Sequence, residues 1–427
     1  MLSACQMMQT ALEHVGLSAT TASWFVGDSP LGGRGIVAAR DISAGEILFV
    51  DRPLIYGPRA GSVTPRGCTV CWRIRAPSFI KCHICALTLC SEKCQNSEIH
   101  ANDCALISRW ANKIPVEEID DTTVSKALTP IRALTLDERG KRFLSSLKAH
   151  ESPQHGSEIK DLKQYFEVNE EDEEFMVLTC RVLDTNAFQI PSAYCSEEMS
   201  LRGLYPVAGL MNHSCMSNTK HSFDRYFGMI VKATRSIPAG AEVLTCYAGL
   251  LWGTPARRRH LYKTKHFLCA CARCADPTER GTLLAALKCF SPECQGSILP
   301  VEPLKMSTAW RCLDCGMLVP ANNICAIQAA LGSLMGTLNF ENAIELEEFL
   351  ENRITKFVPR SNQIVVDLQC RLIWLLGETD GLRWHDEIPI VDTLYMLAYI
   401  VTLRAALVQY SENNAINTSW SALYFPL

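Results

Sequence analysis

The sequence has no long hydrophobic run. A membrane-spanning helix needs about 18 or more consecutive apolar residues, and no segment of the chain reaches that length. The best candidate, 394–403, is short and is followed at once by Arg404, so we interpret it as a buried helix. The first residues lack a basic start and a continuous apolar centre, which argues against a secretory signal peptide. We therefore expect an intracellular protein, without a membrane partner, in the cytoplasm and nucleus.

An excess of positive charge is also lacking. The chain has 41 Lys and Arg against 45 Asp and Glu, which gives a formal net charge of -4. This balance argues against a protein that binds nucleic acid through charge alone. The hydrophobic content of 48% and the charged content of 20% are ordinary for globular proteins. A chain of 427 residues is long enough for several domains with their own cores.

Cysteine, by contrast, is abundant. The chain has 21 cysteines, an odd number that fits a disulfide framework poorly. In a reducing compartment, cysteines at short fixed spacings are metal ligands more often than disulfide partners. We therefore interpret the cysteine clusters as zinc sites.

The first cluster spans residues 68–104. Its short spacings supply eight ligands within 37 residues, the number needed for two tetrahedral zinc sites. Consecutive pairs could share an ion, or the pairs could interleave, and spacing alone does not decide between these arrangements. Few large apolar residues lie between the pairs, whereas structural zinc can supply roughly 10–16 kcal/mol of folding free energy. The expected ligands are Cys68, Cys71, Cys82, Cys85, Cys90, Cys94, His100 and Cys104, with His83 on the surface.

Two further zinc sites are expected downstream. The triplet Cys269, Cys271 and Cys274 lacks a fourth ligand, for which Cys215 is our candidate. A zinc-ribbon spacing follows, with the ligands Cys289, Cys294, Cys312 and Cys315. Six other cysteines have no partner pattern, and we expect them to be buried as small apolar residues: Cys5, Cys180, Cys195, Cys246, Cys325 and Cys370.

One six-residue sequence motif occurs twice in the chain. Residues 40–45, Arg-Asp-Ile-Ser-Ala-Gly, return almost unchanged as residues 235–240, and β-prone residues flank both copies. Each copy predicts a strand, a glycine turn and a second strand. Between them lie the first zinc cluster and a helical stretch at about 105–183, whose acidic run 170–174 is a solvated helix start or loop. Beyond residue 322 the apolar periodicity predicts helices at 324–334, 343–349, 364–376 and 391–407.

Residues 24–316 resemble the SET and MYND domain family of protein-lysine methyltransferases. Gly33-Arg34-Gly35 is similar to the first cofactor-binding turn of a SET domain, and Asn212-His213-Ser214-Cys215 is similar to its NHSC box. Tyr247 falls at the position of the family's active-site tyrosine. The segment that holds Arg257, Arg258, Leu261, Phe267 and the cysteine triplet resembles the post-SET segment.

The expected zinc-binding segments also resemble segments of this family. Residues 68–104 are similar to a MYND finger, which implies the interleaved pairing: Cys68, Cys71, Cys90 and Cys94 on one ion, and Cys82, Cys85, His100 and Cys104 on the other. The ribbon at 289–315, with Trp310 inside it, is most like arthropod-specific members of the family.

The resemblance implies an α+β fold in which an all-β SET domain is split. Its first half (20–60) precedes an inserted MYND zinc finger (66–106) and a helical insert (107–183), and its second half (184–250) follows them. A zinc-bound post-SET segment (251–280), a zinc-ribbon-like segment (285–318) and a helical C-terminal domain (320–427) complete the expected organisation.

The implied activity is S-adenosylmethionine-dependent N-methylation of lysine in a histone or non-histone protein. Alignment of the amine with the methyl group supplies much of the acceleration, and the amine must first lose its proton. Tyr247 is the expected catalytic residue because its hydroxyl can orient the amine. The expected cofactor-binding residues are Gly33, Arg34, Gly35, Asn186, Asn212, His213, Tyr247 and Phe267. Four zinc ions are expected: two in the finger, one in the post-SET segment and one in the ribbon.

Two positions depart from the family's pattern. Lys265 stands where a second tyrosine is usual, two residues before Phe267, and a lysine lining the channel would repel a cationic substrate. Gly32 replaces a polar or basic residue ahead of the glycine turn. The alternative function is therefore a catalytically weak scaffold whose MYND finger binds proline-containing peptides or chromatin partners. In either case we expect a monomer.

Overall fold

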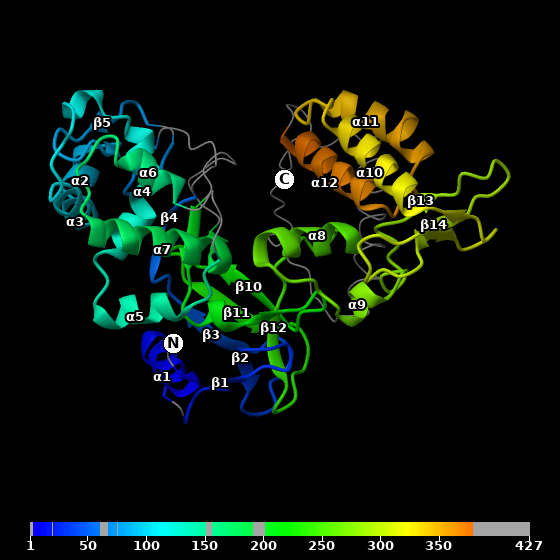
Figure 1. Ribbon diagram of the computed structural model, residues 1–427, viewed down its shortest axis with the longest axis horizontal. Helices are drawn as coiled ribbons and strands as arrows, with labels where there is room; N and C mark the ends of the chain where they lie inside the picture. The colour runs from blue at the N-terminus through cyan, green and yellow to red at the C-terminus, as the bar shows by residue number, and fades with distance from the viewer. Residues whose placement is uncertain are drawn as a thin grey trace. The chain divides into compact units, whose positions relative to one another are not determined.

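The computed structural model describes residues 3–18, 20–59, 67–74, 76–150, 156–190 and 201–378 (Figure 1). The chain divides into two compact units. The first comprises Met1–Asn212 and Thr219–Val243, and the second comprises His213–Asn218 and Leu244–Leu427. Two short strands, β9 (Asn212–His213) and β12 (Glu242–Thr245), continue along the chain from the first unit into the second.

Three sheets combine strands from the two ends of the first unit. Their orders are β1-β2-β12-β9, β10-β11-β3 and β4-β8-β7. Strand β2 pairs antiparallel with β1 and β12, β3 pairs with β11, and β4 pairs with β8. The strands are β1 (Trp24–Asp28), β2 (Arg34–Ala38), β3 (Ile47–Asp51), β4 (Ile55–Pro58), β7 (Phe188–Ile190), β8 (Leu201–Leu204), β10 (Thr219–Phe223) and β11 (Met229–Ala233). Early strands thus pair with late ones, as a split β domain requires.

The repeated motif, residues 40–45 and 235–240, forms two matching turns that contact each other. Ile42 and Ile237 exchange both backbone hydrogen bonds, each at 2.9 Å. The turn glycines also match: Gly45 N donates to Ala233 O, and Gly240 N donates to Ala38 O, both at 2.9 Å. The two similar sequences therefore form a symmetric contact between the two halves of the split domain.

The helices between the two halves follow local sequence signals. The acidic run opens α7 (Glu170–Asn186), whose Asn169 N-cap accepts from Asp172 N at 2.8 Å. Four acidic residues in the first turn suit the positive end of the helix dipole. The inserted elements are β5 (Ile80–Lys81), β6 (Thr88–Leu89), α2 (Glu92–Gln95), α3 (Glu98–Ile107), α4 (Asp121–Ala133), α5 (Glu138–Ser146), α6 (Ser157–Leu162) and α7. A further helix, α1 (Ala4–His14), begins at a capping box of Ser3 and Gln6 and was not anticipated.

The second unit combines a small sheet with helices. The sheet has the order β13-β14-β15-β16, and its buried Trp310 and Ile298 share a hydrophobic core with Leu331 and Phe349 of the helices. The elements are α8 (Thr254–Lys265), α9 (Ala272–Ala275), β13 (Leu287–Lys288), β14 (Ser297–Pro300), β15 (Trp310–Cys312), β16 (Leu318–Val319), α10 (Ala321–Met335), α11 (Ala343–Asn352) and α12 (Gln363–Glu378). Three of the expected C-terminal helices are thus present, and the fourth, at 391–407, lies outside the described residues.

The α+β fold class is confirmed. No helix in the described residues is long and apolar enough to span a membrane. The expectation of six buried unpaired cysteines is only partly met: Cys180 is buried, Cys246 and Cys370 are half-buried, and Cys325 is exposed on α10. The expected burial was wrong for Cys325 because α10 buries only Ile324 and Leu331. The side chains of the remaining two, Cys5 and Cys195, are outside the description.

Candidate functional site

One candidate group of site residues, in the first unit, is a glycine turn between β1 and β2. Gly32 and Gly33 have φ values of +97° and +74°, a left-handed conformation that side chains disfavour. Gly35 is buried, and a Cβ atom there would collide with Glu242 Oε1 and come within 2.8 Å of Asn212 Nδ2. The turn therefore needs glycine both for its backbone conformation and for the close approach of two polar side chains.

Asn212 and Glu242 hold this turn. The Asn212 amide donates to Arg34 O at 2.9 Å and to Glu242 Oε1 at 2.7 Å. Glu242 reaches the turn because β12 pairs with β2, which sets Glu242 opposite Val37. The sequence reasoning missed Glu242, since its position is defined only when the two halves of the domain pair. The result is a polar cradle with one carboxylate, suited to a group that carries positive charge.

Arg34 and Asn186 are brought to a common segment. The Arg34 guanidinium donates to Ser146 O at 3.2 Å and also contacts the Met7 sulfur. The Asn186 amide donates to Lys148 O at 2.7 Å. Both expected cofactor-binding side chains therefore bind backbone carbonyls at the C-terminal end of α5 and just beyond it.

The second unit carries a cluster of rings around His213. The backbone N–H of Tyr247 donates to His213 Nδ1 at 2.9 Å, so the ring proton lies on Nε2, which is 3.3 Å from Cys215 Sγ. Burial lowers the pKa of His213 to about 4, and the imidazole is neutral near pH 7. The His213 ring centroid lies 5.2 Å from that of Tyr247 and 5.7 Å from that of Phe267. The three predicted residues thus form one aromatic group.

Lys265 belongs to the same group. Its Nζ lies 5.6 Å from the centroid of the Tyr247 ring, within the range of a cation–π contact. The departure from the family's pattern therefore lies beside the expected catalytic tyrosine, rather than pointing away from it.

Four groups of side chains are placed to hold metal ions. In each, the four ligand atoms lie within 4.8 Å of one another. The segment 68–104 has the interleaved grouping, Cys68, Cys71, Cys90 and Cys94 in one group and Cys82, Cys85, His100 and Cys104 in the other. The other two groups are Cys215 with Cys269, Cys271 and Cys274, and Cys289 with Cys294, Cys312 and Cys315. Closed sets of thiolates, with at most one imidazole, fit structural zinc.

A second layer of contacts orients the histidine ligand. His100 Nδ1 lies 2.6 Å from the carbonyl of Gln95, which leaves Nε2 to face the metal, 3.6 Å from Cys85 Sγ. Such an outer partner fixes the tautomer and the plane of a ligating ring. His83, which we expected at the surface, is exposed.

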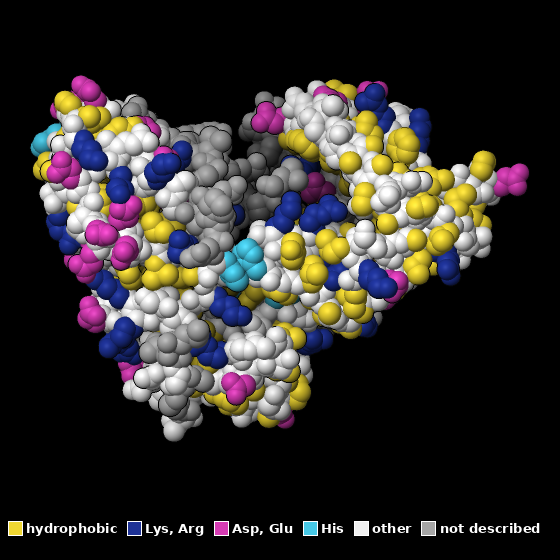
Figure 2. All heavy atoms as spheres, viewed as in Figure 1, with side chains coloured by type: hydrophobic (Ala, Val, Ile, Leu, Met, Phe, Trp, Pro, Cys, Tyr) yellow, Lys and Arg dark blue, Asp and Glu magenta, His cyan; other side chains and the backbone are white. Residues whose placement is uncertain are grey.

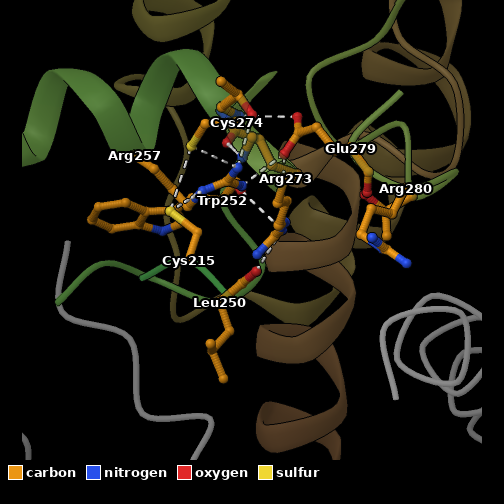
Figure 3. A network of polar contacts seen from close by, with 12 residues as sticks. Cys215, Leu250, Trp252, Arg257, Arg273, Cys274, Glu279 and Arg280 are labelled. Atoms are coloured by element: carbon orange, nitrogen blue, oxygen red, sulfur yellow. Dashed lines mark hydrogen bonds and ion pairs between the residues drawn. The ribbon is translucent and has the colours of Figure 1, made fainter. Parts of the chain in front are cut away.

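Arg257 connects the zinc group of the second unit to a buried carboxylate (Figure 3). Its Nε lies 3.2 Å from Cys215 Sγ, and its Nη2 lies 3.6 Å from Cys274 Sγ. Its Nη1 donates to Glu279 Oε2 at 2.7 Å, and both side chains are almost fully buried. Arg273 also approaches Glu279, at 3.8 Å. The Arg257-Arg258 pair was noted in the sequence only as a motif, and nothing there indicated Glu279.

The comparisons with known proteins identify the class. Residues 33–248 match the SET domain family. The chain is 34% identical over 384 residues to the SET domain-containing protein SmydA-8, isoform B, of Drosophila melanogaster, which covers 88% of this chain and 84% of that protein. The chain therefore belongs to the SET domain family, as a SMYD-type member with an arthropod relative.

More distant relatives agree with this assignment. The histone-lysine N-methyltransferase SMYD3 of Mus musculus is 28% identical over 305 residues, 65% of this chain and 67% of its own. The N-lysine methyltransferase SMYD2-A of Xenopus laevis is 29% identical over 282 residues, 62% of this chain and 64% of its own.

Proposed function

We propose that the protein is an S-adenosylmethionine-dependent protein-lysine N-methyltransferase. Its membership of the SET domain family and the names of its SMYD relatives support this function. The observation that carries the proposal is the ring group of His213, Tyr247 and Phe267, which the Cys215 zinc group holds through the contact between His213 and Cys215. A tyrosine fixed in this way suits a reaction that depends on positioning.

The residues of the first unit suit the charged part of the cofactor. S-adenosylmethionine supplies an electrophilic methyl group on a sulfonium, and its amino acid portion carries an ammonium. The Glu242 carboxylate and the exposed backbone of the glycine turn provide acceptors for such a cation. We assign cofactor binding here to Gly33, Arg34, Gly35, Asn186 and Asn212, and we add Glu242 as the residue that shapes the cradle.

The residues of the second unit suit the reacting groups. His213 and Phe267 offer ring faces for cofactor binding, and Tyr247 is the proposed catalytic residue. Tyr247 lies two residues beyond the end of β12, and His213 holds its backbone N–H. We assign to the hydroxyl of this fixed residue the role of accepting a hydrogen bond from the substrate amine. The neighbouring group of Cys215, Cys269, Cys271 and Cys274 would supply four protein ligands to zinc and leave no open position, so that the metal would be structural.

The position of Lys265 favours a second candidate function, that of a scaffold. The Lys265 ammonium beside Tyr247 would oppose the approach of a substrate ammonium. The protein would then be a scaffold in which residues 68–104, as a MYND finger, bind proline-containing peptides or chromatin partners. In both cases we propose a monomer located in the cytoplasm and nucleus, with the domain boundaries expected from the resemblance.

Two measurements test the proposed methyltransferase activity. Calorimetry of the zinc-loaded chain should show S-adenosylmethionine binding, and absence of heat would contradict the proposal. With a radiolabelled methyl donor, Tyr247→Phe should lower the rate of transfer to protein substrates by about 100-fold or more, while binding of the cofactor remains. Tyr262→Phe, at an exposed tyrosine of α8, is the matched control and should retain the wild-type rate. Equal rates for Tyr247→Phe and wild type would remove Tyr247 from the mechanism.

A further inference from the structure

Residues 276–283 form a turn with a strained backbone. Glu279, Arg280 and Leu283 have φ values of +54°, +62° and +54°, in the left-handed region that residues with a side chain rarely adopt. The Asp276 carboxylate holds the turn, since it accepts hydrogen bonds from two backbone N–H groups of the turn, each at 2.8 Å. Strain of this kind persists where the surrounding structure imposes it, and it is concentrated at functional sites.

Glu279 uses both of its carboxylate oxygens in this turn. Its Oε1 accepts from Thr254 N at 2.9 Å, at the first residue of α8, where a carboxylate also suits the positive end of the helix dipole. Its Oε2 accepts from Arg257 Nη1 at 2.7 Å and lies 3.8 Å from Arg273 Nη2. Whereas the Lys and Arg side chains over α8 in Figure 2 face the surface, these three charged side chains are at most 1% exposed. One buried carboxylate therefore fixes two buried guanidinium groups.

The two arginines hold the segment that follows Tyr247. Arg273 Nη2 donates to Leu250 O at 2.9 Å, and Arg257 Nη1 donates to Trp252 O (Figure 3). Both carbonyls belong to the short connection between Tyr247 and α8. Displacement of either guanidinium would therefore free the backbone next to the proposed catalytic residue.

Arg257 also reaches Tyr247 by a second route, through the histidine. Its Nε lies 3.2 Å from Cys215 Sγ, which in turn lies 3.3 Å from His213 Nε2. His213 Nδ1 accepts from the backbone N–H of Tyr247 at 2.9 Å. An unbroken series of polar contacts therefore runs from Glu279 to the backbone of Tyr247 itself.

We infer that Glu279 is a positioning residue for Tyr247. This inference rests on the proposed function, to which it adds a residue that does not touch the reacting groups. Glu279 acts through Arg257 and Arg273, which fix the backbone at Tyr247 and directly after it. A reaction that depends on the alignment of an amine with a methyl group is sensitive to small displacements of the residue that orients the amine.

A purely structural role for Glu279 makes a different prediction. The carboxylate would then only compensate two buried cations and cap α8, and its loss would destabilise the second unit as a whole. Amide hydrogens on α8 and at Tyr247 would become less protected to the same extent. A positioning role requires instead that the change is largest at Tyr247.

Hydrogen exchange of single tyrosine amides, measured by NMR on the zinc-loaded chain with labelled tyrosine, separates the two roles. The amide signals of Tyr247 and of Tyr262, on α8, would be identified by their absence in Tyr247→Phe and Tyr262→Phe. Glu279→Gln preserves the size of the side chain, but its amide N–H group cannot accept from an arginine. We expect it to speed exchange at Tyr247 by about tenfold or more, with little change at Tyr262. Glu348→Gln, at an exposed glutamate of α11, is the control and should leave both rates unchanged.

Methyl transfer from a radiolabelled donor, with mixed core histones as the probe, gives a second test. Glu279→Gln should lower kcat by about 10- to 100-fold with little change in KM, because alignment rather than binding is lost. In the Tyr247→Phe background the same substitution should have no further effect, since it acts through Tyr247. If the two losses multiply, Glu279 acts elsewhere and the inference is overturned.

A milder variant makes the test independent of a folding defect. Asp276→Ala removes the acceptor that holds the strained turn and leaves the buried charges paired, so it should speed exchange at Tyr247 by a smaller factor. Equal acceleration at Tyr247 and Tyr262, or unchanged exchange at Tyr247 in both variants, would overturn the inference. Unchanged exchange at Tyr247 with retained S-adenosylmethionine binding would refute this inference alone, whereas absence of cofactor binding by the wild type would refute the proposed function alone.

Discussion

At the residue scale, Arg257 stands out because one buried side chain faces two kinds of negative group. A zinc ion with four thiolates carries a net negative charge, and the Arg257 guanidinium donates toward two of those sulfurs. The same guanidinium pairs with Glu279, which is about as buried as Arg257 itself. A single side chain thereby compensates the metal site and a carboxylate that has little access to water.

We predict that Arg257→Gln weakens zinc retention at the Cys215 group by about 10- to 100-fold. It should also destabilise the chain by about 3 kcal/mol, because Glu279 loses its nearest cation and keeps only the more distant Arg273, at 3.8 Å. Zinc release to a chromogenic chelator and urea unfolding would measure the two effects. The double variant Arg257→Gln, Glu279→Gln should regain much of the stability but not the zinc retention. If it regains both, the contact with the thiolates contributes nothing.

Asp51 is a second residue whose environment has a measurable consequence. It is fully buried, and its Oδ2 accepts from the backbone N–H groups of Val207 and Ala208, each at 2.8 Å. Burial raises the pKa of Asp51 to about 7, despite these hydrogen bonds. The native state thus keeps the proton over a range in which the unfolded chain has already lost it.

The sign of the pH dependence follows from this difference. Between about pH 4 and pH 7 the native state binds more protons at Asp51, so its contribution to stability falls as the pH rises, by at most about 4 kcal/mol over the range. Asp51→Asn keeps an acceptor for the two N–H groups and cannot ionise. Urea unfolding should therefore show that the variant gains stability relative to wild type as the pH rises toward 7. His14, whose Nε2 lies 3.5 Å from Asp51, requires a His14→Gln control. A constant difference between variant and wild type would contradict the prediction.

At the scale of elements, the two matching turns hold the split β domain together. Gly45 and Gly240 have φ values of +84° and +78°, and a Cβ atom at either position would meet no other atom within 4 Å. Backbone conformation alone, rather than a lack of space, therefore requires glycine at both turns.

We predict that Gly45→Ala and Gly240→Ala each destabilise the chain by about 1 kcal/mol, and that asparagine costs less at both positions because it tolerates the left-handed conformation. Gly35→Ala should be worse than either, since its Cβ collides with Glu242 and Asn212. Thermal unfolding of the five variants would give the ranking. An alanine no worse than asparagine at residue 45 or 240 would show that φ is not the reason for glycine there.

Much of the architecture was accessible from local patterns. Three short-range signals predicted structure: the repeated motif at 40–45 and 235–240, the acidic start of α7, and the cysteine spacings. The structure has matching turns, a helix and ligand groups at these positions. Glu242 and Glu279 were not accessible in this way, and Lys265 was expected near the active site only from the family resemblance. Each depends on which segments pair or pack in three dimensions, and neither carboxylate belongs to a motif.

At the scale of the whole molecule, the four zinc groups are distributed over two separate cores. The segment 68–104 contributes Trp72 and Leu87 to the core of the first unit, and Arg132 of α4 pairs with Asp103 at 2.6 Å. The ribbon contributes Trp310 to the core of the second unit, yet its Cys315 is exposed. Metal in the two units should therefore differ in access to chelators.

We predict that the chain binds four zinc ions and that chelation removes the ribbon zinc first, because a chelator can reach the exposed Cys315 without unfolding. The zinc ions at 68–104 should leave only as the first unit unfolds, since Cys68, Cys82 and Cys85 are buried. Zinc release would be followed with a metal-sensitive dye and assigned with Cys315→Ser, which should abolish the fast phase and bind three ions. Hydrogen–deuterium exchange of peptides that contain Trp72 would report unfolding of the first unit. Release of all ions in a single phase that coincides with unfolding would show that the sites do not differ in access and that the two units lose their metal together.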